Sequence, residues 1–193
     1  MRRPAVSGWL ALALAGGLAY PFLVYFGLAV VRPAVLLLLA LGLMALRMLG
    51  FRRHADGRRW LAAFMVAALG LAALSLLSQQ TAVKAYPIAV SLAAAAVFGL
   101  SLRYPPTVIE RFARTAEPDL SPEGIAYTRK VTWVWLAFLL ANAAISAATA
   151  LWGSPEQWTL WNGLLSYLAM GLLFGAEFLV RLAVRRRHTR ALP

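Results

Sequence analysis

Residues 33–49 read PAVLLLLALGLMALRML, and this stretch decides the fold of the chain. It is almost wholly Leu, Ala and Val, and a helix needs roughly 20 apolar residues to cross the hydrocarbon core of a bilayer. Further runs of this kind follow one another along the sequence, so we predict an all-α, polytopic transmembrane bundle of about six helices that forms one domain over residues 1–193. The predicted crossings are residues 8–31, 33–49, 60–78, 87–102, 131–152 and 160–182.

The composition of the chain agrees with a lipid environment. Of its 193 residues, 62% are apolar and only 13% are charged, whereas a typical soluble domain carries about 25% charged residues. A globule of this size has too little interior to bury that much apolar surface. The sequence contains no cysteine, which excludes disulfides, thiolate metal sites and thiol nucleophiles.

Basic residues are distributed unevenly between the two sides that this topology defines. Seventeen of the 19 Lys and Arg residues, Arg47 among them, fall on the side of the N-terminus, and only Arg32 and Lys84 fall on the other. Cytoplasmic segments carry such an excess, so we predict a bacterial inner-membrane protein with both termini in the cytoplasm. The net charge of +12 comes from short clusters between apolar runs, a pattern that does not indicate nucleic acid as a partner.

The longest predicted loop, residues 103–130, lies on the basic side and contains a helix signal. Pro105 and Pro106 end the fourth crossing, and Thr107 followed by Glu110 is a capping-box pattern. We therefore expect a short interfacial helix lying on the membrane. Its expected apolar face comprises Val108, Ile109, Phe112 and Ala116, and its expected polar face comprises Glu110, Arg111 and Arg114.

A second capping signal stands at the end of this loop. Ser121 is a suitable N-cap residue, and Pro122 is suited to the first helical position. The fifth helix is therefore expected to begin in the cytoplasm and to enter the membrane near Lys130.

Three polar residues within the apolar runs are candidates for an intramembrane site. Asn142 and Ser146 lie one turn apart near the centre of the fifth crossing, where they predict either interhelical hydrogen bonds or contact with a substrate. Glu177 lies toward the end of the sixth crossing, one turn before Arg181. It predicts either an ion pair with that arginine or a site for a proton or cation.

Small residues recur at helical spacing in two of the crossings. Gly171 and Gly175 form a Gly-x-x-x-Gly pair, and Ser91 and Gly99 belong to a similar stripe. Small residues allow helix backbones to approach closely. The pattern predicts packing within one bundle, with a dimer interface as the alternative.

The sequence lacks the residue patterns on which common enzyme classes depend. It contains no pair of carboxylates suited to acid–base work, no histidine cluster with metal-ligand spacing and no glycine-rich phosphate loop. We therefore predict no catalytic residue, no metal and no cofactor, and a non-enzymatic role is favoured.

The second half of the chain resembles a known group of proteins. Its motifs are similar to those of a family of uncharacterised bacterial inner-membrane proteins that tend to be encoded beside ketosynthase, acyl-carrier and acyltransferase genes of the aryl-polyene lipid type. The layout is also similar to that of intracellular septation protein A, a small polytopic protein implicated in envelope and division processes, over Tyr20-Pro21 to Arg47 and over Ile109-Glu110-Arg111. Neither resemblance implies catalytic residues. The motifs are Pro106-x-x-Ile109-Glu110-Arg111, Arg129-Lys130-Val131-Thr132-Trp133-Val134-Trp135 and Trp161-Asn162-Gly163-x-x-Ser166-Tyr167.

Three hypotheses about function follow from these observations. The first is an accessory protein of envelope or lipid biogenesis, whose basic cytoplasmic face recruits anionic lipid or an acidic protein such as an acyl carrier protein. The second is a small lipid or metabolite transporter or flippase built around Pro21, Asn142 and Glu177. The third is a membrane-embedded enzyme acting on acyl or isoprenoid substrates. The residues expected to bind the acidic partner or lipid head groups are Arg111, Arg114, Arg129 and Lys130.

Overall fold

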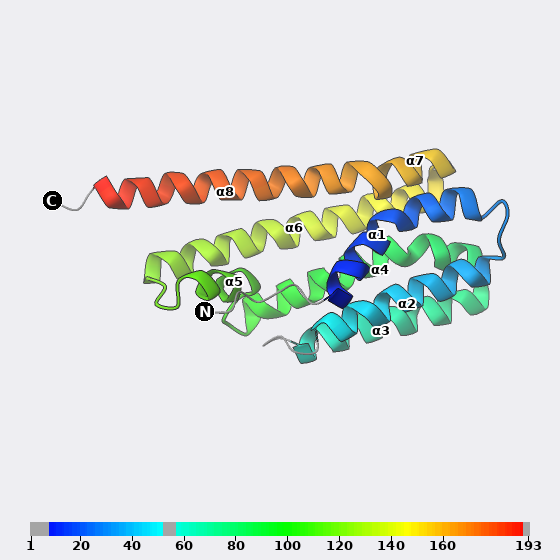
Figure 1. The fold of residues 1–193 in the computed structure, drawn as a ribbon, viewed down its shortest axis with the longest axis horizontal. Helices are drawn as coiled ribbons and strands as arrows, with labels where there is room; N and C mark the ends of the chain where they lie inside the picture. The colour runs from blue at the N-terminus through cyan, green and yellow to red at the C-terminus, as the bar shows by residue number, and fades with distance from the viewer. Residues whose placement is uncertain (1–7, 52–56, 191–193) are drawn as a thin grey trace.

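The chain folds into a bundle of long helices, which a computed structural model describes for residues 8–51 and 57–190, without the side chains of residues 9, 10 and 181–190. The long helices lie side by side in alternating directions, with α5 and α7 at opposite ends of the bundle (Figure 1). This confirms the predicted all-α fold. The elements are α1 (Gly8–Gly27), α2 (Pro33–Phe51), α3 (Gly57–Leu77), α4 (Gln79–Arg103), α5 (Val108–Ala116), α6 (Pro122–Trp152), α7 (Pro155–Leu160), the π-helix η1 (Trp161–Leu165) and α8 (Ser166–Arg190).

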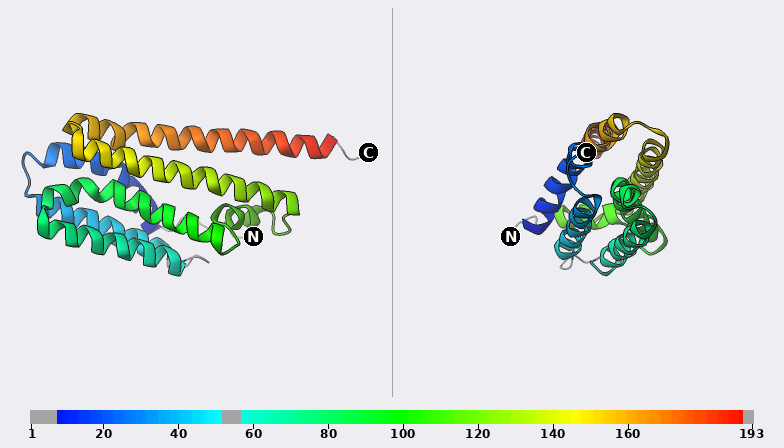
Figure 2. Two further views of the ribbon diagram at one scale, coloured as in Figure 1. Left: turned by 180° about the vertical axis from the view of Figure 1, so that it is seen from behind. Right: turned by 90° about the vertical axis from the view of Figure 1, so that its right-hand side faces the viewer.

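Five segments of the described chain are long and apolar enough to cross a membrane. They are α2, α3, α4, α6 and the stretch Pro155–Val180, in which α7, η1 and α8 follow one another. The first predicted crossing, α1, is a shorter apolar helix over Ala11–Gly27, and it is inclined to the other helices (Figure 2).

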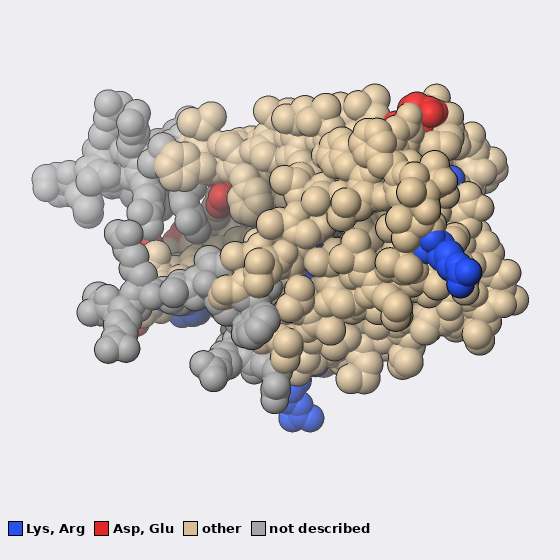
Figure 3. All heavy atoms as spheres, turned by 45° about the vertical axis from the view of Figure 1, so that its right-hand side comes forward, with Lys and Arg blue, Asp and Glu red and all other residues tan. Residues whose placement is uncertain are grey.

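Large apolar side chains cover the outside of the bundle. Val66, Leu76 and Leu172 are 70%, 87% and 76% exposed, respectively. Few Lys, Arg, Asp or Glu atoms interrupt the apolar middle of the face drawn in Figure 3. An apolar surface of this extent needs lipid around it, so the protein is a multi-pass helical membrane protein.

The two ends of the bundle differ in the number of basic residues that they carry. We call the end where α2 and α4 finish and α3 and α6 begin the basic end, and the end that carries Arg32 and Lys84 the opposite end. Basic residues of the described chain at the basic end are Arg58, Arg59, Arg103, Arg111, Arg114, Arg129 and Lys130, and Arg47 lies in the last turns of α2.

Helix α4 begins eight residues before the predicted start at Pro87, because Ser78 caps it. The Ser78 hydroxyl accepts a hydrogen bond from the Thr81 N–H at 3.2 Å. Pro87 therefore lies inside the helix, where its missing N–H leaves the carbonyl of Val83 without its usual partner. The Tyr20 hydroxyl of α1 donates to that carbonyl at 2.8 Å, so a neighbouring helix supplies the bond that proline removes.

The two helix starts predicted around the long loop are confirmed. Thr107 and Glu110 form a capping box at the start of α5, in which each side chain bonds to the other residue's backbone N–H. The Ser121 hydroxyl accepts from the Gly124 N–H at 3.2 Å, with Pro122 as the first helical residue of α6. Since α6 begins at Pro122, it is nine residues longer than the predicted crossing that starts at Val131.

The first predicted helix ends earlier than expected. Helix α1 stops at Gly27, and residues 28–31 form a turn in which the N–H groups of Val30 and Val31 bond to the Gly27 carbonyl. A residue before proline is disfavoured in helical conformation, so the chain turns before Pro33 opens α2. The prediction of a continuous helix over residues 8–31 is therefore wrong over its last turn.

The main apolar core lies among α1, α2, α3, α4 and α7. Tyr20, Met44, Val83 and Trp158 are fully buried there, and the Tyr20 and Tyr86 rings lie 4.4 Å apart between centroids. Helix α4 is central to the bundle because it packs along both α3 and α6.

Candidate functional site

A buried asparagine joins three elements of the apolar interior. Asn142 of α6 is 8% exposed, and its Nδ2 donates to Oγ of Ser91 in α4 at 3.0 Å. Its Oδ1 accepts a hydrogen bond from Nε1 of Trp161 in η1 at 3.2 Å. Ser91, expected as a small packing residue, is therefore also a hydrogen-bonding partner.

A second buried amide continues these contacts one turn further along α6. The Ser146 hydroxyl donates to Oδ1 of Asn162 at 2.7 Å, and Nδ2 of Asn162 donates to the Trp158 carbonyl at 2.9 Å. Asn162 lies in the π-helix, where the Ser166 N–H bonds to the Trp161 carbonyl five residues back. Sequence reasoning did not select Asn162, and its only signal was the Trp161-Asn162-Gly163 motif.

We call Ser91, Asn142, Ser146, Trp161 and Asn162 the polar network. The oxygen and the nitrogen of both amides have hydrogen-bond partners, so none of these buried groups is left unsatisfied. Interhelical bonds of this type contribute about 0.6 kcal/mol each on average. The geometry agrees with the interhelical interpretation of Asn142 and Ser146, and contact with a substrate stays a prediction.

The remaining intramembrane candidate, Glu177, is half-buried in α8. Its predicted ion-pair partner is Arg181, whose side chain lies outside the described residues. The choice between an ion pair and a proton or cation site therefore stays a prediction.

The small-residue positions differ in their surroundings. A Cβ placed on Gly171 or Gly175 would meet nothing within 4 Å, whereas one on Gly99 would make ordinary contacts of 3.8 Å and 3.9 Å with Leu136. Gly171 and Gly175 therefore mark no close helix approach within the described chain, contrary to the expectation of packing inside one bundle. Their alternative role, a contact with another chain, stays a prediction.

Helix α5 buries a different face from the one expected. Val108 and Ala113 are buried, but Phe112 is 62% exposed. Glu110, which the pattern placed on the polar face, is only 5% exposed. The capping box and an ion pair turn this carboxylate inward, so the predicted polar face is wrong at Glu110. Phe112 was expected to lie against lipid, and its place on the apolar face stays a prediction.

Arg114 is occupied by contacts within its own loop. Its Nε and Nη2 donate to the Glu110 carboxylate at 3.0 Å and 2.8 Å, and its Nη1 donates to the Pro118 carbonyl at 3.0 Å. Both bonds to Glu110 end on Oε1, and with the Pro118 contact they hold the guanidinium in one geometry. Arg114 thus fixes α5 and the chain after it, and this reduces its value as a partner-binding residue.

The other three predicted partner-binding residues differ from one another. Arg111 is half-buried and donates from Nε to the Pro106 carbonyl at 3.1 Å. Arg129 and Lys130 are exposed on the first turns of α6. Of the four, these last two are the charges best placed to meet another molecule.

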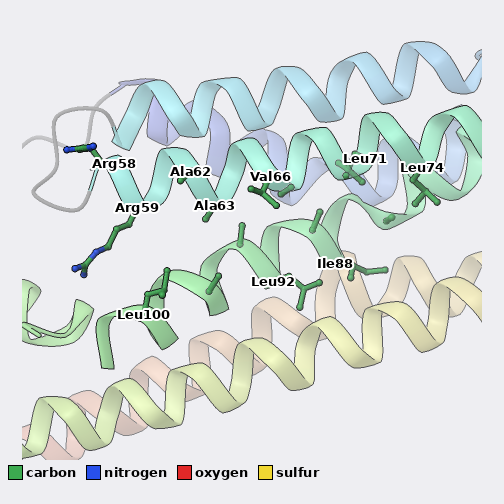
Figure 4. A pocket seen from close by; sticks show the side chains of 16 residues that line it. Arg58, Arg59, Ala62, Ala63, Val66, Leu71, Leu74, Ile88, Leu92 and Leu100 are labelled. Atoms are coloured by element: carbon green, nitrogen blue, oxygen red, sulfur yellow. The ribbon is translucent and has the colours of Figure 1, made fainter. Parts of the chain in front are cut away.

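Sequence reasoning missed a groove of about 680 Å³ on the outer face of the bundle, between α3 and α4. Figure 4 shows side chains of both helices lining it along its length. A Cβ on Gly70 would meet nothing within 4 Å, so the groove is open at that position. Small and aliphatic residues make up most of the walls, such as Ala63, Val66 and Gly70 of α3 and Ala89, Leu92 and Ala96 of α4.

The groove ends on two arginines at the basic end. Arg58 and Arg59 belong to its lining, and both extend at the same end of it in Figure 4. Arg58 is exposed, whereas Arg59 is half-buried and donates to the Tyr104 carbonyl at 3.4 Å. An apolar trough that ends on guanidinium groups matches a molecule with an apolar chain and an anionic head.

No protein family matches the sequence, and no curated protein or solved structure is similar to it. The class of protein therefore follows from the fold alone, which is that of a multi-pass helical membrane protein. These comparisons identify neither of the families that the sequence motifs resemble.

Proposed function

We propose that this protein is a non-enzymatic lipid-binding protein of the membrane that serves envelope or lipid biogenesis. The α3–α4 groove takes up an acyl chain of an anionic lipid, and Arg58 and Arg59 bind its phosphate. The single observation that carries this proposal is the continuity of the apolar groove with the two guanidinium groups.

The dimensions of the groove support an elongated apolar ligand. From Arg58 to Leu74, α3 rises by roughly 24 Å, which exceeds one leaflet of a hydrocarbon core about 30 Å thick. A groove lined by alanine and glycine also suits the backbone of another helix. The arginines favour the lipid, since each cationic side chain near an anionic membrane surface gains about 1 kcal/mol.

The proposal includes an orientation and a membrane. The basic end faces the cytoplasm of a bacterial inner membrane, where the positive-inside rule puts such charges. Reporter fusions after Gly57 and Glu117 are expected to report cytoplasm, and fusions near Lys84 and Glu156 the far side. A periplasmic signal at Glu117 contradicts this orientation.

The exposure of Arg129 and Lys130 supports a second, weaker contact. We propose that these residues recruit an acidic cytoplasmic protein, such as an acyl carrier protein, to the lipid-binding groove. Replacing both with Gln is expected to weaken binding of that protein, more at low salt than at high salt. Arg114→Gln serves as the comparison, because its contacts lie within the loop.

Native mass spectrometry of the full chain in an uncharged detergent tests the lipid site. Titration with phosphatidylglycerol and phosphatidylcholine is expected to give preferential retention of the anionic lipid. Gly70→Phe fills the groove and is expected to reduce binding of both lipids. Joint replacement of Arg58 and Arg59 with Gln reduces binding of phosphatidylglycerol alone, by about tenfold.

Gly42→Phe is the matched control for the groove variant. Gly42 lies in α2 outside the groove, and a Cβ there also meets nothing within 4 Å. Equal lipid binding by the Gly70→Phe and Gly42→Phe proteins would show that the groove is not the site. Lys84→Gln at the opposite end controls for the loss of positive charge.

A further inference from the structure

Arg47 lies inside α2, and its guanidinium is turned into the bundle. Sequence analysis assigned this residue to the basic side as a topology signal, but it stands four residues before the end of α2 at Phe51. Its Nη2 lies 2.5 Å from the point that a Cβ on Gly17 would occupy. Gly17 is in the middle of α1 (Gly8–Gly27), so the side chain reaches toward the membrane interior rather than out toward the head groups.

The direction of the Arg47 side chain follows from helix geometry. Side chains in an α-helix point back toward its N-terminus, and the N-terminus of α2 is at the opposite end. The absence of a Cβ on Gly17 leaves the space that the guanidinium fills. A long cationic side chain near a helix end usually extends to the interface instead.

One polar atom of the Arg47 guanidinium lacks an acceptor within the described part of the protein. This atom, Nε, is buried and has no hydrogen-bond partner there. A buried donor without a partner costs roughly 1–3 kcal/mol, and an unpaired charge costs more. Such a group is expected to be matched by something that the described residues do not supply.

Two tyrosines complete the surroundings of Arg47. The Tyr167 hydroxyl of α8 lies 3.9 Å from the same point beside Gly17, and it is near enough to Arg47 and Tyr86 for both to act on its charge. Tyr86 of α4 is 2% exposed, and its hydroxyl is buried without a partner. The neighbouring Tyr20 hydroxyl is already engaged by the Val83 carbonyl.

We propose that Arg47, Tyr86 and Tyr167 form an anion-binding centre inside the bundle, which takes the carboxylate or phosphate head of an amphiphile. We call these residues the arginine centre. A guanidinium and two hydroxyl groups present donors, and a carboxylate or phosphate presents only acceptors. The planar fork of arginine fits both anions.

The arginine centre is independent of the α3–α4 groove. It is built from α2, α4 and α8 beside α1, and none of its residues belongs to the lining of the groove. It therefore extends the proposed function without depending on it.

Three ligands with the same chain and different heads test the centre. The full chain in an uncharged detergent is titrated by calorimetry with dodecanoate, dodecyl phosphate and dodecanol. We expect an anionic ligand to bind more tightly than dodecanol, and the preferred head distinguishes a fatty-acid carboxylate from a lipid phosphate. Arg47→Gln is expected to weaken binding of the anion by about tenfold or more, and Tyr167→Phe by about fivefold.

Several comparisons keep this test decisive. Arg47→Lys retains the charge, and its affinity for the anion is expected to lie between those of the wild type and Arg47→Gln. Tyr167→Phe removes one hydroxyl and is expected to leave the fold intact. Equal affinity for dodecanol and both anions, or unchanged anion binding in both Arg47→Gln and Tyr167→Phe, would overturn the arginine centre. If only joint replacement of Arg58 and Arg59 with Gln reduces anion binding, the groove stands and the arginine centre fails.

Discussion

The polar network and the arginine centre differ in how their hydrogen bonds are satisfied. In the network, the side chains of Asn142 and Asn162 have partners for both of their polar atoms. In the arginine centre, Arg47 Nε and the Tyr86 hydroxyl are buried without partners in the described chain. The difference teaches that polarity inside a membrane is not by itself a sign of function. Satisfied groups hold helices together, and unsatisfied ones indicate a missing ligand.

The largest expected change in stability comes from a substitution that breaks the polar network. Asn142→Leu is expected to lower the free energy of unfolding by about 1–2 kcal/mol, because the Ser91 hydroxyl and Trp161 Nε1 lose their partner. Unfolding in mixed micelles of SDS and a neutral detergent measures the change. Ser91→Ala removes one of the two bonds and is expected to cost about half as much. Wild-type stability of Asn142→Leu would show that these bonds contribute nothing.

In the arginine centre, a substitution is expected to raise the free energy of unfolding instead of lowering it. Without ligand, Arg47→Met should raise the free energy of unfolding by about 1 kcal/mol, because a half-buried guanidinium whose Nε has no partner is replaced by an apolar side chain of similar length. The same unfolding assay applies, with Lys84→Met at the opposite end as the control for charge. A loss of stability as large as that of Asn142→Leu means that Arg47 has a partner in the protein and needs no ligand.

Two adjacent tyrosines, one whose hydroxyl has a hydrogen-bond partner and one whose hydroxyl has none, are expected to differ by a smaller amount in stability. Tyr20→Phe is expected to cost about 0.6 kcal/mol, since the Val83 carbonyl loses its donor, whereas Tyr86→Phe should change the free energy of unfolding by about zero. The two rings are neighbours in one core, tilted at 49° to each other, so each variant controls for the other.

A second substitution tests the role of Pro87 in this contrast. In a Pro87→Ala background, Ala at this position supplies the N–H that Val83 normally lacks. The cost of Tyr20→Phe is then expected to vanish. An unchanged cost in that background contradicts the account of α4 in which Tyr20 compensates for the proline.

Local signals made much of the fold predictable from the sequence. The apolar runs located the long helices, and the pairs Thr107–Glu110 and Ser121–Pro122 located two helix starts correctly. Each of these signals acts within a few residues. The start of α4 was missed because Gln79 and Lys84 interrupt the apolar pattern, although Ser78 is a good N-cap residue.

The candidate sites were less predictable because they depend on contacts between distant residues. Ser91 and Asn142 are 51 positions apart, and no spacing rule pairs them. The inward turn of Arg47 requires Gly17 of α1 and Tyr167 of α8 to meet at one place. The burial of Glu110 likewise follows from packing of α5, not from its amphipathic pattern.

The last prediction concerns the glycines of α8. Replacing both Gly171 and Gly175 with Ala should leave the stability of the monomer unchanged or raise it by about 1 kcal/mol, because alanine favours the helix and a Cβ meets nothing within 4 Å at either position. Gly17→Ala is the contrasting variant, since its Cβ displaces the Arg47 guanidinium and should weaken binding of the anionic ligand.

The α8 glycine variant also tests whether the glycine face of α8 contacts a second chain or lipid. A glycine pair in a membrane helix matters when another backbone lies against it, and no part of the described chain does so at these positions. Sedimentation of the wild-type and doubly substituted proteins in a density-matched detergent measures their oligomeric state. If Ala at both positions shifts a dimer toward monomer, the unfilled face of α8 is an interface between chains. If the oligomeric state is unchanged, the glycines face lipid, and Arg47 Nε and the Tyr86 hydroxyl stay two of the four buried side-chain atoms of the described chain that lack a partner, beside Trp158 Nε1 and the Thr159 hydroxyl.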